Sequence, residues 1–133
     1  MVRLLLDQAQ LVIELSAVER RLARRRESVR VPRSSIRRVQ LTDDPWTWLR
    51  GVRRPGTHVP GGLAAGTWQR TAGRDFVMLR GRGQDGVVIA LAAGEEFQRV
   101  LLSTSHARAL VEALQRDVVD DAPADVTTIA DQA

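Results

Sequence analysis

The chain has 133 residues, of which 44% are hydrophobic and 27% charged, and its formal net charge is +4. This length suits a single domain with a core of its own. Cysteine is absent, which excludes disulfides, thiol nucleophiles and cysteine zinc sites. The longest apolar run, residues 87–93, is far shorter than a membrane span. We therefore expect one cytoplasmic domain.

The charge of the chain is carried unevenly. All twenty basic residues are arginines. Codon bias in a GC-rich genome is the favoured explanation. Whatever the cause, the planar guanidinium group is suited to binding carboxylate and phosphate groups. Residues 1–116 hold twenty arginines and eleven acidic residues (+9), whereas residues 117–133 hold five aspartates and no base (−5). A basic body with an acidic tail occurs in proteins with anionic partners and also in proteins without them.

Three short segments near the N-terminus predict strands and a helix. Residues 11–15 form a short, partly β-branched apolar run, which is typical of a strand. Residues 17–26 contain good helix formers and predict either a short helix or a turn between strands. Residues 29–33 alternate in polarity, and Pro32, which has no amide hydrogen to donate, places them at a sheet edge or at the start of a strand.

The next predicted strand contains a bulge. Ile36 and Val39 are three residues apart and Leu41 follows after two more, so a bulge at residues 37–38 would return all three side chains to one face. Residues 42–45 have turn chemistry. Trp46 and Trp48 follow, and on a strand they would share a face. Together with Trp68 they could seat a base or a peptide, but packing is the favoured role.

The stretch of residues 50–66 combines glycines, arginines and a histidine more densely than any other. It is predicted to be a loop, in which Pro55-Gly56 and Pro60-Gly61 form type II turns. Backbone amides in such turns, together with arginine side chains, could clamp a phosphate. The favoured alternative is that this loop only reverses the chain between two strands and that its arginines are solvated. Four side chains of this loop are candidates for ligand binding: Arg50, Arg53, Arg54 and His58.

After this loop, four strands are predicted at the spacing of an antiparallel meander: residues 63–70, 75–79, 86–91 and 97–102. Several of these strands are apolar on both faces, so another element should cover the second face. The best cover is an amphipathic helix from Ser105, its expected N-cap, to Val118. Its apolar stripe comprises Ala107, Leu110, Val111, Leu114 and Val118. Residues 119–133 lack periodicity and predict a disordered acidic tail.

A set of short motifs occurs in a fixed order over residues 10–116: Val31-Pro32, Ile36-x-x-Val39, Arg50-Gly51, Arg54-Pro55-Gly56-Thr57, Pro60-Gly61, Gly66-Thr67, Arg74-Asp75-Phe76, Val87-Val88-Ile89 and Phe97-Gln98-Arg99. With these motifs the chain resembles a group of uncharacterised actinobacterial proteins of pleckstrin-homology-like fold. The resemblance implies a mainly β domain over residues 1–118, a partly open antiparallel barrel or sandwich of six to seven strands capped by a C-terminal helix. It implies little about activity, because that fold hosts many functions.

The second arginine-rich segment, residues 20–30, contributes two further candidate ligand-binding residues, Arg24 and Arg25. Each basic residue near an anionic membrane contributes about 1 kcal/mol. Lipid-binding pleckstrin-homology domains carry a pattern with lysine and an aromatic residue in their first loop, and this chain lacks both there. A solvated face is therefore the favoured interpretation. Nucleic-acid binding is not expected, because no recognition-helix, RNP or KH pattern is present.

The sequence favours binding over catalysis. His58 and His106 are far apart in sequence, and no spacing suggests a nucleophile–base pair or a metal site. We therefore predict a non-enzymatic binding or assembly module without a cofactor, which acts through protein–protein or self-association because open strand edges favour pairing between chains. The alternative is electrostatic binding of anionic lipid headgroups or phosphate-bearing ligands through the loop 50–66, with the protein peripheral at the membrane.

Overall fold

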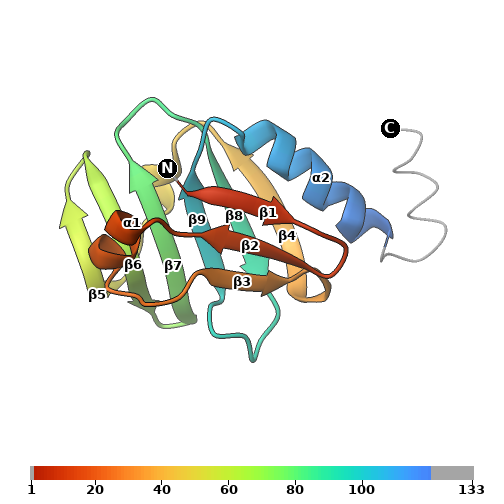
Figure 1. Cartoon of the computed structure of the whole chain (residues 1–133), viewed down its shortest axis with the longest axis horizontal. Coiled ribbons are helices and arrows are strands. Elements are labelled where there is room, and N and C mark those ends of the chain that lie inside the picture. Colours follow the sequence, from red (N-terminus) through yellow and green to blue (C-terminus); the bar gives the residue numbers. More distant parts are fainter. Residues whose placement is uncertain (1, 121–133) are drawn as a thin grey trace.

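The computed structural model describes residues 2–120, with the backbone alone for residues 116–120. The chain forms two layers (Figure 1). One layer is a six-stranded sheet with the order β4-β8-β9-β7-β6-β5, and the other combines a three-stranded sheet, β1-β2-β3, with the C-terminal helix α2. The mainly β prediction is thus confirmed, as is the packing of the C-terminal helix on a sheet. Among the described residues, the two sheets do not close into a barrel.

The three-stranded sheet is formed by β1 (Arg3–Leu6), β2 (Gln10–Glu14) and β3 (Val29–Pro32), all antiparallel. Asp7 makes the turn between the first two strands, because its Oδ1 accepts hydrogen bonds from the amides of Ala9 (2.7 Å) and Gln10 (2.8 Å). These bonds, above all the one from Gln10, lower the pKa of Asp7. Pro32 ends β3 at an edge of this sheet, as predicted.

Helix α1 (Ala17–Ala23) connects β2 to β3. Ser16 and Glu19 form a capping box at its start: the Glu19 amide donates to Ser16 Oγ (3.2 Å) and the Ser16 amide to Glu19 Oε1 (2.9 Å). Arg24 ends the helix in the left-handed conformation (φ 53°), so the helix is shorter than the predicted span 17–26. Thr57 Oγ1 donates to the carbonyl oxygen of Leu22 (2.7 Å), which ties α1 to the six-stranded sheet.

The six-stranded sheet contains one pair of parallel strands. Its members are β4 (Ile36–Thr42), β5 (Val52–Val59), β6 (Leu63–Arg70), β7 (Gly73–Arg80), β8 (Gly86–Leu91) and β9 (Arg99–Ser103). Neighbouring strands are antiparallel except β7 and β9. The prediction of an antiparallel meander is therefore wrong here, because β8 pairs with the distant β4 and leaves β9 to lie between β8 and β7.

The described chain has nine strands instead of the six or seven expected. The two strands not predicted are β1, which has only four residues, and β5, whose Pro55 and Gly56 favour a turn. The bulge predicted in β4 is confirmed: the register shifts between Ile36 and Arg38. Ile36 and Val39 are buried as a result, and Leu41 packs against the same core.

Helix α2 (Ala107–Asp120) packs on β4 and β8 with its predicted stripe. Ala107, Leu110, Val111 and Leu114 are buried, whereas the side chain of Val118 lies outside the described residues. The helix begins at Ala107, two residues after the expected N-cap Ser105, and in the turn before it Thr104 Oγ1 accepts a hydrogen bond from the His106 amide (3.1 Å). The tail was expected to begin at residue 119, but α2 extends to Asp120. The remaining residues of the expected tail, 121–133, lie outside the part of the chain described.

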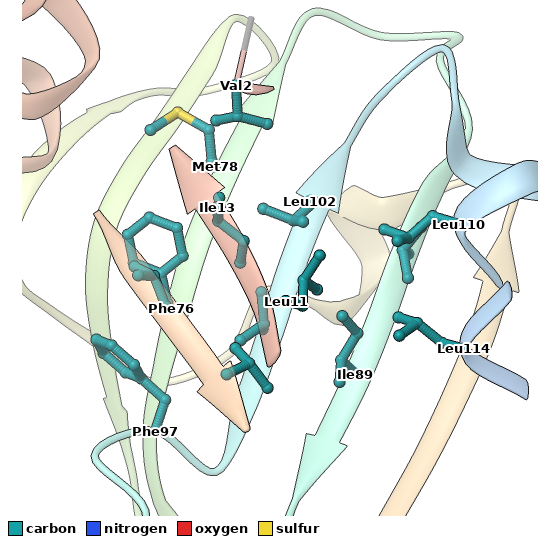
Figure 2. Close-up of a cluster of buried hydrophobic side chains, with 14 of the residues drawn as sticks. Val2, Leu11, Ile13, Phe76, Met78, Ile89, Phe97, Leu102, Leu110 and Leu114 are labelled. Atoms are coloured by element: carbon teal, nitrogen blue, oxygen red, sulfur yellow. The ribbon is translucent and has the colours of Figure 1, made fainter. Parts of the chain in front are cut away.

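Two hydrophobic clusters occupy the two faces of the six-stranded sheet. The larger lies between the layers and is shown in Figure 2; its buried side chains include Leu11, Ile13, Phe76, Ile89, Leu102 and Leu114. The smaller, on the opposite face, contains Trp68, Val77 and Leu101 and is covered by Trp46, Trp48 and Leu49. Trp46 and Trp48 belong to the 3-10 helix η2 (Pro45–Trp48), not to a strand. The second apolar face is thus covered by this short helix.

Candidate functional site

Most of the predicted loop over residues 50–66 is a β-hairpin made of β5 and β6. The turn at Pro60-Gly61 is confirmed: Gly61 has a positive φ (73°) and the Gly62 amide donates to the Val59 carbonyl oxygen (2.9 Å). Pro55-Gly56 is not a turn, because both residues lie inside β5. The chain therefore reverses once in this region, where two turns were expected.

A bulge in β5 explains why Gly56 and Gly66 are glycines. Arg53 lies opposite Trp68 and Gly56 opposite Gly66, so two residues of β5 face one residue of β6. A Cβ on Gly66 would stand 2.3 Å from the Pro55 carbonyl oxygen, and Gly66 has a φ of +131°. Gly66 has to be glycine for this close approach of the two strands.

The three candidate arginines of this hairpin do not converge. Arg53 lies opposite Trp68 and therefore shares the face of the smaller hydrophobic cluster. Arg54 lines a pocket with residues of the opposite face. Arg50 precedes β5, is exposed and donates a hydrogen bond to the Leu49 carbonyl oxygen (3.0 Å). A clamp formed by all three side chains is not present in this arrangement.

His58, the fourth candidate, packs between two tryptophans. Its ring is stacked on that of Trp46, with centroids 6.4 Å apart, and meets the ring of Trp68 edge-on at 5.8 Å. The Trp46 indole also donates to the Gly81 carbonyl oxygen (2.7 Å). His58 is thus part of the aromatic packing on the face of the smaller cluster.

Arg24 and Arg25 have different environments. Arg24 is exposed at the end of α1. Arg25 forms an ion pair with Glu96 (Nη1 to Oε2, 3.1 Å), and its guanidinium lies over the ring of Phe97, 5.4 Å from the centroid. Through Glu96 and Phe97, Arg25 therefore connects the end of α1 to the segment before β9.

A charged cluster that was not predicted from the sequence lies under Trp48. Asp75, which is fully buried, accepts hydrogen bonds from Arg70 (2.7 and 2.9 Å) and Arg99 (2.7 and 3.1 Å). Arg99 also donates to the Trp48 carbonyl oxygen (2.9 Å). Both oxygens of the carboxylate are thereby engaged, so the cluster fixes η2 to the sheet. Two of its residues, Asp75 and Arg99, belong to the short sequence motifs Arg74-Asp75-Phe76 and Phe97-Gln98-Arg99.

A groove of about 550 Å³ lies between β1 and the start of α2. Leu4, Leu5 and Leu6 form one wall, and His106, Ala109 and Ala113 belong to the other. Within residues 2–120, β1 pairs only with β2, so its second edge is free there. The Asp7 amide donates to the Gln10 carbonyl oxygen (3.0 Å), and the alternation of antiparallel bonding then points the backbone groups of Leu4 and Leu6 to the free edge. Because β1 was not predicted from the sequence, this groove was not predicted either.

The described residues contain no group of three histidine, cysteine or acidic side chains that could hold a metal ion. None of the helices in residues 2–120 is long and apolar enough to cross a membrane. No protein-family model, curated protein or solved structure matches the chain. The resemblance to pleckstrin-homology-like proteins therefore stays a prediction.

Proposed function

We propose that the chain is a non-enzymatic binding module that takes an extended segment of a partner protein along the free edge of β1. The observation that carries the proposal is the juxtaposition of this edge with the apolar groove beside α2. An extended peptide placed there would gain main-chain hydrogen bonds from β1 and would bury its side chains in the groove. Strand addition of this kind needs no catalytic group.

The wall of the groove suits a single strand. Ala109 and Ala113 are one helical turn apart on α2, and their small side chains leave room for a chain next to Leu4 and Leu6. Arg3 and His106 also line the groove. Arg3 forms an ion pair with Glu14 (Nη1 to Oε1, 3.3 Å) but its side chain stays largely exposed, so it can favour an acidic flank on the partner. We therefore infer a partner segment with an apolar centre and an acidic flank.

The size of the edge favours a peptide over a second folded copy. β1 has four residues, and a stable interface between folded proteins buries about 800 Å² on each side. The two-fold pairing of β1 with its copy would also have to accommodate α2 of each protomer next to the shared strands. Self-association through β1 is thus the less favoured alternative to peptide binding. Light scattering distinguishes the two, because self-association gives a species heavier than the monomer of 14.7 kDa.

The fold relationship to pleckstrin-homology-like domains belongs to the same proposal. It is supported by the order of the elements, in which the strands precede one C-terminal helix. The parallel pair of β7 and β9 departs from the antiparallel arrangement that the resemblance implies. Both histidines lie apart from one another, one between tryptophans and one at the groove, which supports a role in binding instead of catalysis.

A displayed peptide library tests the proposal. Peptides selected on the intact protein should lose binding when Ala109→Trp and Ala113→Trp fill the groove, because the large side chains occupy the space of the peptide. Glu112→Trp is the matched control, since it adds the same side chain at an exposed position of the same helix. Selected peptides that bind the filled variant and the control equally well would place the partner elsewhere.

A further inference from the structure

A second, polar pocket lies on the part of the six-stranded sheet farthest from β4 and α2. It has a volume of about 310 Å³ and is lined by three neighbouring strands: Arg54 and Pro55 of β5, Thr67 and Gln69 of β6, and Arg74 of β7. The lining thus contains two arginines and no acidic residue. A pocket with this charge suits an anion.

The register of β5 against β6 places Arg54 on the face of this pocket. Arg53 is opposite Trp68 and Gly56 opposite Gly66, which leaves Arg54 and Pro55 to share one position opposite Thr67. Alternation along the strand directs Arg54 to the face opposite that of Arg53, and the bulge adds Pro55 beside it. Gly56 and Gly66 permit the close approach of the two strands at the bulge, and Pro55 thereby lines the pocket next to Arg54.

Arg74 is positioned by its neighbour on β6. Gln69 lies opposite Arg74, and its Oε1 accepts a hydrogen bond from Arg74 Nε (3.3 Å). This bond leaves the two terminal nitrogens of the guanidinium available. In the described part of the chain neither Arg54 nor Arg74 has an acidic partner.

The nearest acid along β7 does not compete for these guanidiniums. Asp75 lies opposite Trp68 and so belongs to the other face of the sheet. There it is engaged by Arg70 and Arg99. The charge of Arg54 and Arg74 is therefore not neutralised from within the sheet.

We propose that this pocket binds the phosphate group of a small phosphate monoester. Arg54 and Arg74 would each present nitrogens to the phosphate oxygens, and the Thr67 hydroxyl would add one donor. Two guanidiniums match the double charge of a phosphate monoester better than the single charge of a carboxylate. The pocket is also larger than a phosphate group, which leaves space for the remainder of the molecule. The proposal is independent of the groove beside β1.

Amide chemical shifts of the full chain, recorded during titration with inorganic phosphate and then with glycerol phosphate, test the site. The ionic strength is held constant with sodium chloride, so that general screening is the same throughout. We expect saturable shifts at Thr67 and Gln69, and an affinity about tenfold weaker in Arg54→Gln and in Arg74→Gln, because each removes one charged fork. Arg54→Lys, which keeps the charge and loses the fork, should fall between these values.

Arg53→Gln is the matched control. It removes the same charge from the adjacent residue of the same exposed segment, but on the opposite face. Phosphate affinity should be retained in this variant. Equal weakening in Arg53→Gln and Arg54→Gln would mean diffuse attraction to the surface and would overturn the site, as would shifts that do not saturate. Acetate that binds as tightly as phosphate would overturn the ligand class. Circular dichroism confirms that each variant is folded.

Discussion

Asp75 and Arg99 lie opposite each other on the parallel strands β7 and β9, and Arg99 Nη2 stands 2.7 Å from Asp75 Oδ2. Asp75 is the buried end of this pair, whereas Arg99 retains a little exposure. Arg70 approaches the same carboxylate from β6, and Arg99 also reaches the Trp48 carbonyl oxygen. Three strands and the covering 3-10 helix therefore depend on one carboxylate.

Removal of that carboxylate should destabilise the fold strongly. In Asp75→Ala, two partly buried guanidiniums lose their partner, and we expect the free energy of unfolding to fall by about 3 kcal/mol. Urea unfolding followed by tryptophan fluorescence measures the change. The control is Asp43→Ala, at an exposed turn residue. A loss below about 1 kcal/mol, the size usual for surface ion pairs, would show that the cluster has no such structural role.

Substitution of Gly66 by alanine should lower the free energy of unfolding more than the same substitution of Gly83. In Gly66→Ala the new Cβ would stand 2.3 Å from the Pro55 carbonyl oxygen, so we expect a loss of about 3 kcal/mol. Gly83 also has a positive φ (+81°), but a Cβ there meets no atom within 4 Å, and Gly83→Ala should cost about 1 kcal/mol. Equal losses in thermal unfolding would attribute the whole effect to backbone conformation and none to the contact of β5 with β6.

Local patterns in the sequence predicted the elements whose side chains repeat with a clear period. The stripe of α2 and the alternating apolar strands are of this kind, and the spacing of Ile36 and Val39 even predicted a bulge. The order of the strands could not be predicted in this way, because the pairing of β8 with β4 is decided by contacts between distant segments. The parallel pair of β7 and β9 follows from that pairing.

The pocket of Arg54 and Arg74 and the groove beside α2 could be predicted only in part, because both depend on how distant strands pair. Arg54 was among the predicted candidates, but Arg74 lies on another strand and joins Arg54 only through the pairing of strands in the sheet. Arg53 and Arg54 look equivalent in the sequence, and it is the register of β5 against β6 that separates them. The groove beside α2 was missed because a strand as short as β1 has too few residues for its alternation to be recognised.

The turn at Asp7 should make stability depend on pH. Hydrogen bonds from the Gln10 and Ala9 amides lower the pKa of Asp7 below its ordinary value of 3.8. A carboxylate with a lowered pKa in the folded state stabilises the fold above its unfolded pKa, and this contribution is lost as the pH falls through the folded pKa. Asp7→Ala should therefore be less stable than the natural chain at neutral pH, and the difference should shrink at a pH of ~3.

Urea unfolding of the natural chain and of Asp7→Ala at both pH values checks this expectation. Asp7→Asn is the informative control, because its amide oxygen still accepts backbone hydrogen bonds while it carries no charge. This variant should retain much of the turn and lose the pH dependence. A difference between the natural chain and Asp7→Ala that is the same at both pH values would contradict the assignment of the effect to the charged carboxylate.

Hydrogen exchange at single residues should reveal the free edge of β1. The backbone groups of Leu4 and Leu6 point away from β2, whereas those of Leu5 point toward it, as the bond from the Asp7 amide to Gln10 requires. In the free protein we therefore expect the Leu4 and Leu6 amides to exchange much faster than the Leu5 amide. A peptide that pairs with the edge should slow exchange at Leu4 and Leu6 and leave Leu5 nearly unchanged. Protection spread evenly over the three leucines would indicate general stabilisation by the peptide, without strand addition.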